Sequence, residues 1–213
     1  MPTTITRLHP KAQQFRDHQS RADTNRDGFV TRQELWAEMS KAERPRQHLE
    51  RVLQHMMESI DLDGDSKLSR TEIADGVLQT HDKAVTEENV ARAKELAVAI
   101  DDYQDSHDGQ MPKSLEQLVK LGMADQVALS STLADGQQHP WIYKPNASGN
   151  AVVVISPGRV NAQHQYIVVL GNGNVFGIED DSQAALDKIA GPMNLFPVDR
   201  GADTSAPLKK SKP

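Results

Sequence analysis

Apolar residues recur at helical spacing through the first part of the chain. This spacing predicts helices over residues 11–22, 32–43 and 49–60, and a fourth helix that carries Ile73, Val77 and Leu78 and ends near Thr80. Pro45 separates the second helix from the third, because proline ends a helix. Polar segments separate the first helix from the second and the third from the fourth. The pattern therefore predicts two successive helix–loop–helix segments.

A longer apolar stripe follows, and we expect it to form a separate helix. Thr86 is suited to act as its N-cap, and the stripe consists of Val90, Ala93, Leu96, Ala97, Ile100 and Tyr103. This helix should end before Gly109. Residues 114–117, Ser-Leu-Glu-Gln, form a capping-box motif that predicts a short helix to Leu121, with Gly122 as its C-cap.

The pattern changes after residue 140, where β-branched residues become frequent. Strands are predicted at residues 141–143, 151–155, 165–170 and 175–178. Residues 171–174, Gly-Asn-Gly-Asn, predict a hairpin turn between the last two strands. A last helix is expected over residues 182–190, and Pro, Gly and Lys are frequent from there to the end of the chain.

These elements predict an all-α front domain followed by a small α+β domain with an antiparallel sheet. The front domain covers residues 1–82 and consists of the two helix–loop–helix segments. The rear domain covers residues 84–190, and residues 191–213 form a tail that we expect to be disordered. The boundary between the two domains is expected near residues 81–86.

Composition narrows the classes of function. Of the 213 residues, 25% are charged and 37% apolar, which is typical of a soluble globular protein. A net charge of −6, without an extended basic face, argues against a nucleic-acid partner. The absence of cysteine excludes disulfides, zinc–thiolate sites and cysteine nucleophiles. No apolar run reaches the ~18 residues of a membrane span, and the first residues lack a signal-peptide core. Localisation stays open: the cytoplasm or, if a leader was removed, the periplasm or the exterior.

Oxygen-bearing side chains are spaced in the same way in the two polar loops, residues 23–34 and 61–72. They occupy loop positions 1, 3, 5, 9 and 12, and position 12 is glutamate in both. Calcium takes 6–8 oxygen ligands, and this spacing wraps a short loop around one ion, with position 7 supplying its backbone carbonyl and glutamate both oxygens. The sequence therefore predicts two calcium ions, whose ligands are Asp23, Asn25, Asp27, Phe29, Thr31 and Glu34, and Asp61, Asp63, Asp65, Lys67, Ser69 and Glu72.

The two loops are not equal at position 6, where the chain turns sharply and φ is positive. Gly28 suits this position in the first loop, whereas the second loop has Ser66, at a cost of roughly 1 kcal/mol. A fourth acidic residue in the second loop offsets this cost. Val30 and Leu68 occupy position 8 of each loop and are suited to a short two-stranded link between them.

The pair of loops, with the helices that flank them over residues 11–80, resembles the EF-hand family, which implies calcium binding. Two other interpretations of the loops are open. Asp- and Gly-rich segments also form ordinary turns, and a dockerin-type calcium repeat has similar loops. A dockerin repeat lacks the entering helix and usually ends in Asp, whereas these loops end in Glu34 and Glu72. Met39, Met56 and Met57 fit either a calcium sensor that opens a groove or plain core packing.

The rear domain has a second resemblance. Residues 97–122 end a helix, turn through Asp108, Gly109 and Pro112, and enter a Ser-Leu-Glu-Gln-Leu segment. With residues 141–143 and 166–175, this resembles the soluble head of type II secretion pseudopilin-like proteins, over residues 84–190. The resemblance implies an α+β domain with an antiparallel sheet and a structural part in a secretion or envelope assembly. The long apolar N-terminal helix of that family is replaced here by a polar helix behind the two loops.

No catalytic motif is present: the chain has no Gly-x-Ser-x-Gly, no His-Glu-x-x-His and no phosphate-binding glycine loop. We therefore expect a protein that is not an enzyme. The leading hypothesis is a calcium-binding protein whose paired loops regulate or stabilise a C-terminal interaction domain with a protein partner of unknown identity. The alternative is a structural pseudopilin-like component with fixed calcium ions.

Overall fold

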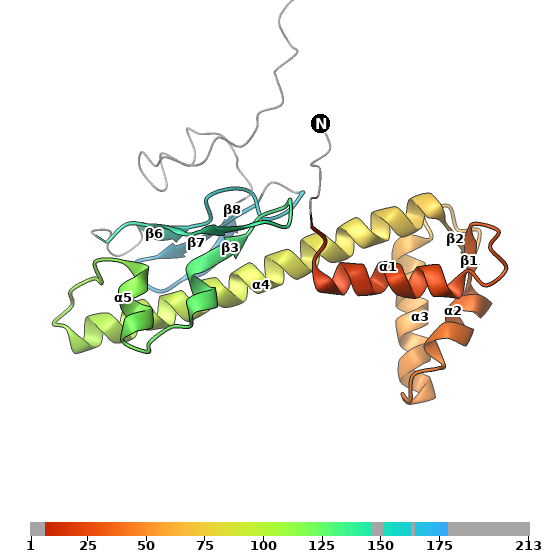
Figure 1. Cartoon of the computed structure of the whole chain (residues 1–213), viewed down its shortest axis with the longest axis horizontal. Coiled ribbons are helices and arrows are strands. Elements are labelled where there is room, and N and C mark those ends of the chain that lie inside the picture. The colour runs from red at the N-terminus through yellow and green to blue at the C-terminus, as the bar shows by residue number, and fades with distance from the viewer. Residues whose placement is uncertain (1–6, 146–150, 163–164, 179–213) are drawn as a thin grey trace, which may run out of the picture. The chain divides into compact units, whose positions relative to one another are not determined.

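The computed structural model describes residues 7–145, 151–162 and 165–178 (Figure 1). These residues form a mixed α+β fold, as predicted. The helices are α1 (Pro10–Ala22), α2 (Arg32–Met39), α3 (Arg46–Ile60), α4 (Arg70–Ser106), α5 (Leu115–Lys120) and the 3-10 helix η1 (Gln126–Leu129). The strands are β1 (Phe29–Thr31), β2 (Lys67–Ser69), β3 (Ser130–Thr132), β4 (Gln138–Pro140), β5 (Ile142–Tyr143), β6 (Val152–Ile155), β7 (Tyr166–Leu170) and β8 (Val175–Ile178).

Among the described residues, no helix has both the length and the apolar character that crossing a membrane requires. The helix predicted over residues 182–190 and the tail predicted over residues 191–213 lie outside the described residues.

The contacts divide the chain into two compact units, which meet in sequence between Glu88 and Asn89. The dividing point lies inside α4, whose first residues belong to the front unit and whose remaining residues belong to the rear unit. The predicted helix end near Thr80 and the predicted N-cap at Thr86 are therefore wrong, since α4 runs unbroken through both positions. No proline or glycine lies between them, and His81, Ala84 and Val85 are buried and continue the apolar face from Val77.

The front unit is built on the four predicted helical segments. Ala22, Val30, Leu35, Leu53, Met57, Ile60 and Leu68 form its core, with Phe15, Trp36, Met39, Met56 and Ile73 packed against them. Thr31 caps α2 through a capping box with Glu34. The predicted end of this helix at residue 43 is wrong, because α2 ends at Met39. Ser40 follows as the C-cap, and its hydroxyl donates to the Trp36 carbonyl (2.6 Å).

The rear unit contains two antiparallel sheets. β5, β6, β7 and β8 form one sheet in sequence order, which agrees with the four predicted strands. The predicted turn at residues 171–174 joins β7 to β8, with Gly173 at φ 80° and the Asn174 carbonyl accepting from the Leu170 amide. Val152, Ile155, Tyr166, Val168 and Ile178 form a buried hydrophobic cluster on this sheet. The pairing of β3 with β4 was not predicted.

The predicted capping box at residues 114–117 is not formed. Ser114 makes no side-chain cap to α5. The side-chain oxygen of Gln117 instead accepts from the Lys113 amide (2.9 Å), and its nitrogen donates to the Tyr103 hydroxyl (2.8 Å). The glutamine therefore bonds both to the residue before the N-cap of its own helix and to the end of α4.

Candidate metal centre

The two predicted loops are joined by a short antiparallel sheet. β1 and β2 pair in a register that places Val30 opposite Leu68, with Phe29 opposite Ser69 and Thr31 opposite Lys67. Position 8 of one loop thus faces position 8 of the other. Because β1 leads into α2 and β2 leads into α4, the sheet fixes both loop ends relative to the core.

Side-chain oxygens of the first loop turn inward and accept hydrogen bonds from the loop's own backbone. Asp23 Oδ2 accepts from the Gly28 amide (3.2 Å), and Asn25 Oδ1 accepts from the Asp27 amide (2.9 Å). Asp27 Oδ1 in turn accepts from the Phe29 amide (2.9 Å). The bonds hold the side chains of positions 1, 3 and 5 against the loop's own backbone, as Asx-type turns do.

The second loop repeats these bonds position by position. Asp61 Oδ2 accepts from the Ser66 amide (2.9 Å) and Asp63 Oδ1 from the Asp65 amide (3.1 Å). Asp65 Oδ1 accepts from the Lys67 amide (2.8 Å). The carboxylates of Asp61, Asp63 and Asp65 bring one oxygen each within 4.8 Å of one another. The two loops therefore share one conformation, although only four of their twelve positions carry the same residue.

The position-12 glutamates close both loops from the helix that follows. Glu34 Oε2 accepts from the Thr31 amide (2.9 Å) and Glu72 Oε2 from the Ser69 amide (2.8 Å). The second oxygen reaches position 2, where Glu34 Oε1 accepts from the Thr24 hydroxyl (3.2 Å) and Glu72 Oε1 from the Leu62 amide (2.7 Å). Each glutamate thus spans from the end of its loop to its beginning.

Hydrogen bonds keep both glutamates ionised. The Thr31 amide lowers the pKa of Glu34, with further help from the Thr31 and Thr24 hydroxyls and against the effect of burial. The Ser69 amide and hydroxyl lower the pKa of Glu72 in the same way, again opposed by burial. Since a carboxylate binds a cation only in its ionised form, both groups are ready to act as ligands at neutral pH.

The backbone at position 6 has the predicted positive φ in both loops. Gly28 has φ 87° and Ser66 has φ 65°, so both residues lie in the left-handed region. A Cβ on Gly28 would also lie 3.1 Å from Arg70 Nε. The second loop accommodates a side chain in this conformation, whereas the first uses the residue that has none.

One carboxylate oxygen of the first loop is buried and has no hydrogen-bond partner among the described residues. It is Oδ1 of Asp23, the side chain at position 1. A buried anionic oxygen without a partner is costly, so it indicates that a cation or another donor belongs there. The donor set of both loops contains only oxygen atoms, which fits a hard cation such as calcium rather than zinc or copper.

The remaining predicted ligands lie where the loop numbering puts them. Thr31 and Ser69 donate or accept bonds with the two glutamates and so lie beside them. Phe29 and Lys67 are the first residues of β1 and β2, and their carbonyl roles stay predictions. Thr24 and Leu62 were not predicted as neighbours of the glutamates. No sequence signal could have found them, because one uses a hydroxyl and the other a backbone amide.

Within the described ranges, Asp61, Asp63 and Asp65 are the one group of three His, Asp or Glu residues close enough to share an ion. The acidic end of α4, with Asp101, Asp102 and Asp105, does not converge in this way. No protein-family model matches the chain, and comparison with curated proteins and with solved structures likewise finds no match.

Proposed function

We propose that each loop binds one calcium ion and that the protein is a non-enzymatic calcium-binding protein of EF-hand type. The observation that carries this proposal is the repeated set of hydrogen bonds that turns positions 1, 3, 5 and 12 of both loops inward. Ordinary Asp-rich turns give no reason for two loops to repeat this set of bonds and then pair through Val30 and Leu68. The buried Asp23 oxygen adds independent support in the first loop.

Calorimetric titration of the full chain with calcium tests the proposal. The wild-type protein should bind two ions, and Glu34→Gln and Glu72→Gln should each remove one, because glutamine offers a single neutral oxygen where glutamate offers two charged ones. Glu43→Gln is a matched control, since this exposed residue lies between the two loops and in neither. Unchanged binding in both loop variants would refute the assignment.

The role of the ions separates two versions of this function. Met57 lies in the core, and Met39 and Met56 pack against it, which supports core packing over an exposed methionine surface. Met39 and Met56 also line a groove of about 360 Å³ between α1, α2 and α3, which is the feature that a sensor would open. Sensor sites have dissociation constants of roughly 10⁻⁷–10⁻⁵ M and extracellular structural sites roughly 10⁻⁴–10⁻³ M, so the titration also decides between them.

We further propose that the rear unit is an interaction domain, with the pseudopilin-like resemblance as its best lead. The order of its elements supports this: the end of α4, a turn in which Asp108 and Gly109 both have positive φ, then α5 and the four-stranded β5–β8 sheet. If the ions are fixed, calcium would stabilise a structural component of a secretion or envelope assembly. A weak, millimolar dissociation constant for calcium in the titration would favour this structural role.

A further inference from the structure

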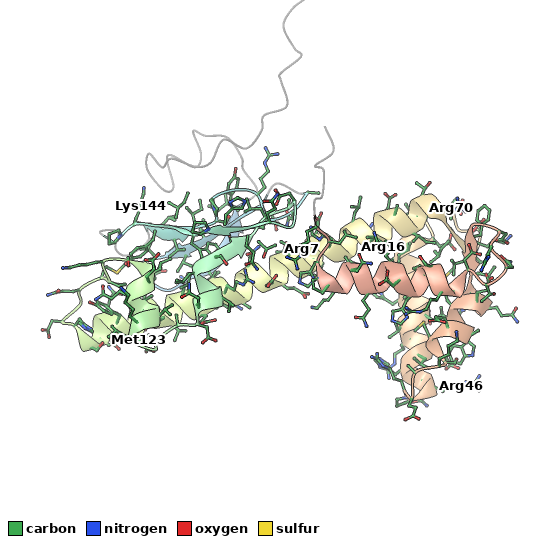
Figure 2. The ribbon with its side chains drawn as sticks, in the orientation of Figure 1. Arg7, Arg16, Arg46, Arg70, Met123 and Lys144 are labelled. Atoms are coloured by element: carbon green, nitrogen blue, oxygen red, sulfur yellow. The ribbon has the colours of Figure 1, made fainter. Side chains whose placement is uncertain are left out.

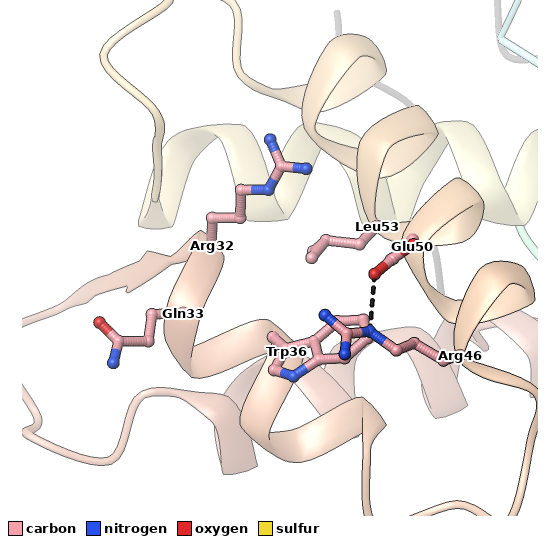
Figure 3. A pocket seen from close by; sticks show the side chains of 6 residues that line it. All are labelled: Arg32, Gln33, Trp36, Arg46, Glu50 and Leu53. Carbon is pink, nitrogen blue, oxygen red and sulfur yellow. Dashed lines mark hydrogen bonds and ion pairs between the residues drawn. The ribbon is translucent and has the colours of Figure 1, made fainter.

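A second groove lies on the front unit, beside the start of α2. It has a volume of about 410 Å³ and lies between α2 and α3, where Arg32, Gln33 and Trp36 line one side and Arg46, Glu50 and Leu53 the other. Figure 3 shows Leu53 pointing from α3 toward the same space that the indole of Trp36 borders. The floor is therefore apolar and the rim is charged.

On the α3 side of the groove, Arg46 forms an ion pair with Glu50 and lies over the Trp36 ring. The guanidinium carbon of Arg46 lies 5.8 Å from the centroid of the Trp36 ring, and Arg46 Nε donates to Glu50 Oε1 (2.8 Å), as Figure 3 shows. Figure 2 places Arg46 at the start of α3. The cation–π contact and the ion pair both favour this position of the guanidinium, and both charged side chains are at least half exposed.

The α2 side carries charge that the groove itself does not neutralise. Among the described residues, the side chains of Arg32 and Gln33 make no hydrogen bond or ion pair, while Glu50 is engaged by Arg46. The lining therefore has two guanidinium groups and one carboxylate, for a net positive charge. An occupant that complements it carries a carboxylate for Arg32 and an apolar group for the floor.

We propose that this groove binds an acidic peptide segment of a partner protein, in which an apolar side chain lies next to a carboxylate. The apolar side chain packs on Leu53 and the edge of the Trp36 indole, and the carboxylate accepts from Arg32. Tryptophan and arginine are the residues most enriched at the centres of protein interfaces, and here they share one groove.

The arrangement favours a peptide over a single-stranded nucleic acid. Arg46 lies over one face of the Trp36 ring, so a base would have to displace this guanidinium to stack on that face. A nucleic acid also carries one negative charge per nucleotide, whereas the groove offers a single unengaged guanidinium. One carboxylate beside one apolar group matches what the lining presents.

The test is an NMR titration of the ¹⁵N-labelled full chain with the peptide acetyl-Phe-Leu-Asp-Asp-amide. The chain has two tryptophans, and the Trp36 indole signal is assigned by its loss in Trp36→Phe. Saturable shifts of the Trp36 indole and the Arg32 and Gln33 signals are expected at about 5 mM peptide, a concentration that detects millimolar dissociation constants. The neutral peptide acetyl-Phe-Leu-Asn-Asn-amide should bind about tenfold more weakly, as should acetyl-Ala-Ala-Asp-Asp-amide.

Arg32→Gln removes the proposed carboxylate partner and should weaken the acidic peptide about tenfold. Arg70→Gln is the matched control: Arg70 occupies position 10 of the second loop as Arg32 does of the first, is also exposed, and does not line the groove. Equal affinity for the acidic and neutral peptides, or an unchanged affinity in Arg32→Gln, would overturn the proposal. Tighter binding of an oligo-dT than of the peptide at Trp36 would overturn it in favour of a nucleic acid.

Discussion

Val30 and Leu68 lie opposite each other in the β1–β2 sheet, and both side chains are fully buried. Each stands at position 8 of its loop, so the same contact that closes the core also joins the two candidate ion sites. A change at one of these residues should therefore reach both loops.

Leu68→Ala is expected to destabilise the front unit by about 3 kcal/mol, since it leaves a cavity in a closed core. Phe29→Ala in the neighbouring strand position should change stability by less than about 1 kcal/mol, because Phe29 is 42% exposed. Urea unfolding followed by circular dichroism measures both. If the sheet couples the sites, Leu68→Ala also weakens calcium binding at the first loop; an effect confined to the second loop would show that the sites are independent.

Ser66 and Gly28 offer a reciprocal test of loop strain. Ser66→Gly should stabilise the second loop by up to about 1 kcal/mol, partly offset by the greater freedom of glycine in the unfolded chain. Gly28→Ser should destabilise the first loop by about 1–2 kcal/mol, because φ is 87° and the new Cβ would crowd Arg70. Unfolding curves and calcium titrations of the two variants are the measurements. A destabilising Ser66→Gly would mean that the serine hydroxyl contributes more than its backbone costs.

The loops could be predicted in detail because their chemistry is local. Oxygen side chains at fixed offsets, a turn residue at position 6 and an apolar residue at position 8 are all visible in the printed sequence. The unpartnered Asp23 oxygen was not predictable, since its burial depends on the folded core. The contacts of Thr24 and Leu62 with the glutamates likewise depend on how each following helix is placed.

The fold could be predicted where the sequence pattern is periodic. It could not be predicted where a long-range contact determines the local structure. The hairpin between β7 and β8 was found from its Gly-Asn-Gly-Asn turn. The sequence pattern predicts two helices in place of α4 because Thr86 resembles a cap, although no proline or glycine lies between Thr80 and Thr86. The pairing of β3 with β4 could not be predicted, because Gln138, His139 and Pro140 show no strand pattern.

Glu38 gives the front unit a specific pH dependence. This buried side chain accepts from Arg21 Nε (2.9 Å) and from Lys41. The hydrogen bond from Lys41 and then that from Arg21 lower the pKa of Glu38 from 4.5 to about 2, against the effect of burial. Because the pKa is lower in the folded chain, the stabilisation is present above pH 4.5 and is lost as the pH falls toward 2.

Glu38→Gln should therefore lower stability at pH 7 by about 1–2 kcal/mol, an amount reduced by the exposure of Arg21 and Lys41 to salt. The difference between wild type and variant should shrink steadily between pH 4.5 and about 2. Urea unfolding at several pH values measures it. A difference that stays constant over this range would show that the carboxylate charge does not carry the effect.

Asn89 ties α4 to β3 inside the rear unit. Its side chain is fully buried, its Nδ2 donates to the Thr132 carbonyl (2.6 Å), and its Oδ1 accepts from the Thr132 amide (2.8 Å). The side-chain amide of Asn89 therefore satisfies backbone groups of β3 as a neighbouring strand would. This explains how β3 is held beside α4.

Asn89→Leu keeps the side-chain size but leaves the Thr132 amide and carbonyl buried without these partners, at a cost of about 2–4 kcal/mol. Asn89→Asp should retain the bond from the Thr132 amide and set a carboxylate against the Thr132 carbonyl, so it should also destabilise the unit. Lys94→Ala on an exposed turn of the same helix is the control and should change stability by less than about 0.5 kcal/mol. Hydrogen exchange at the Thr132 amide measures the effect directly: protection should fall in Asn89→Leu and stay at the wild-type level in Lys94→Ala. Full protection of this amide in Asn89→Leu would show that another acceptor holds β3.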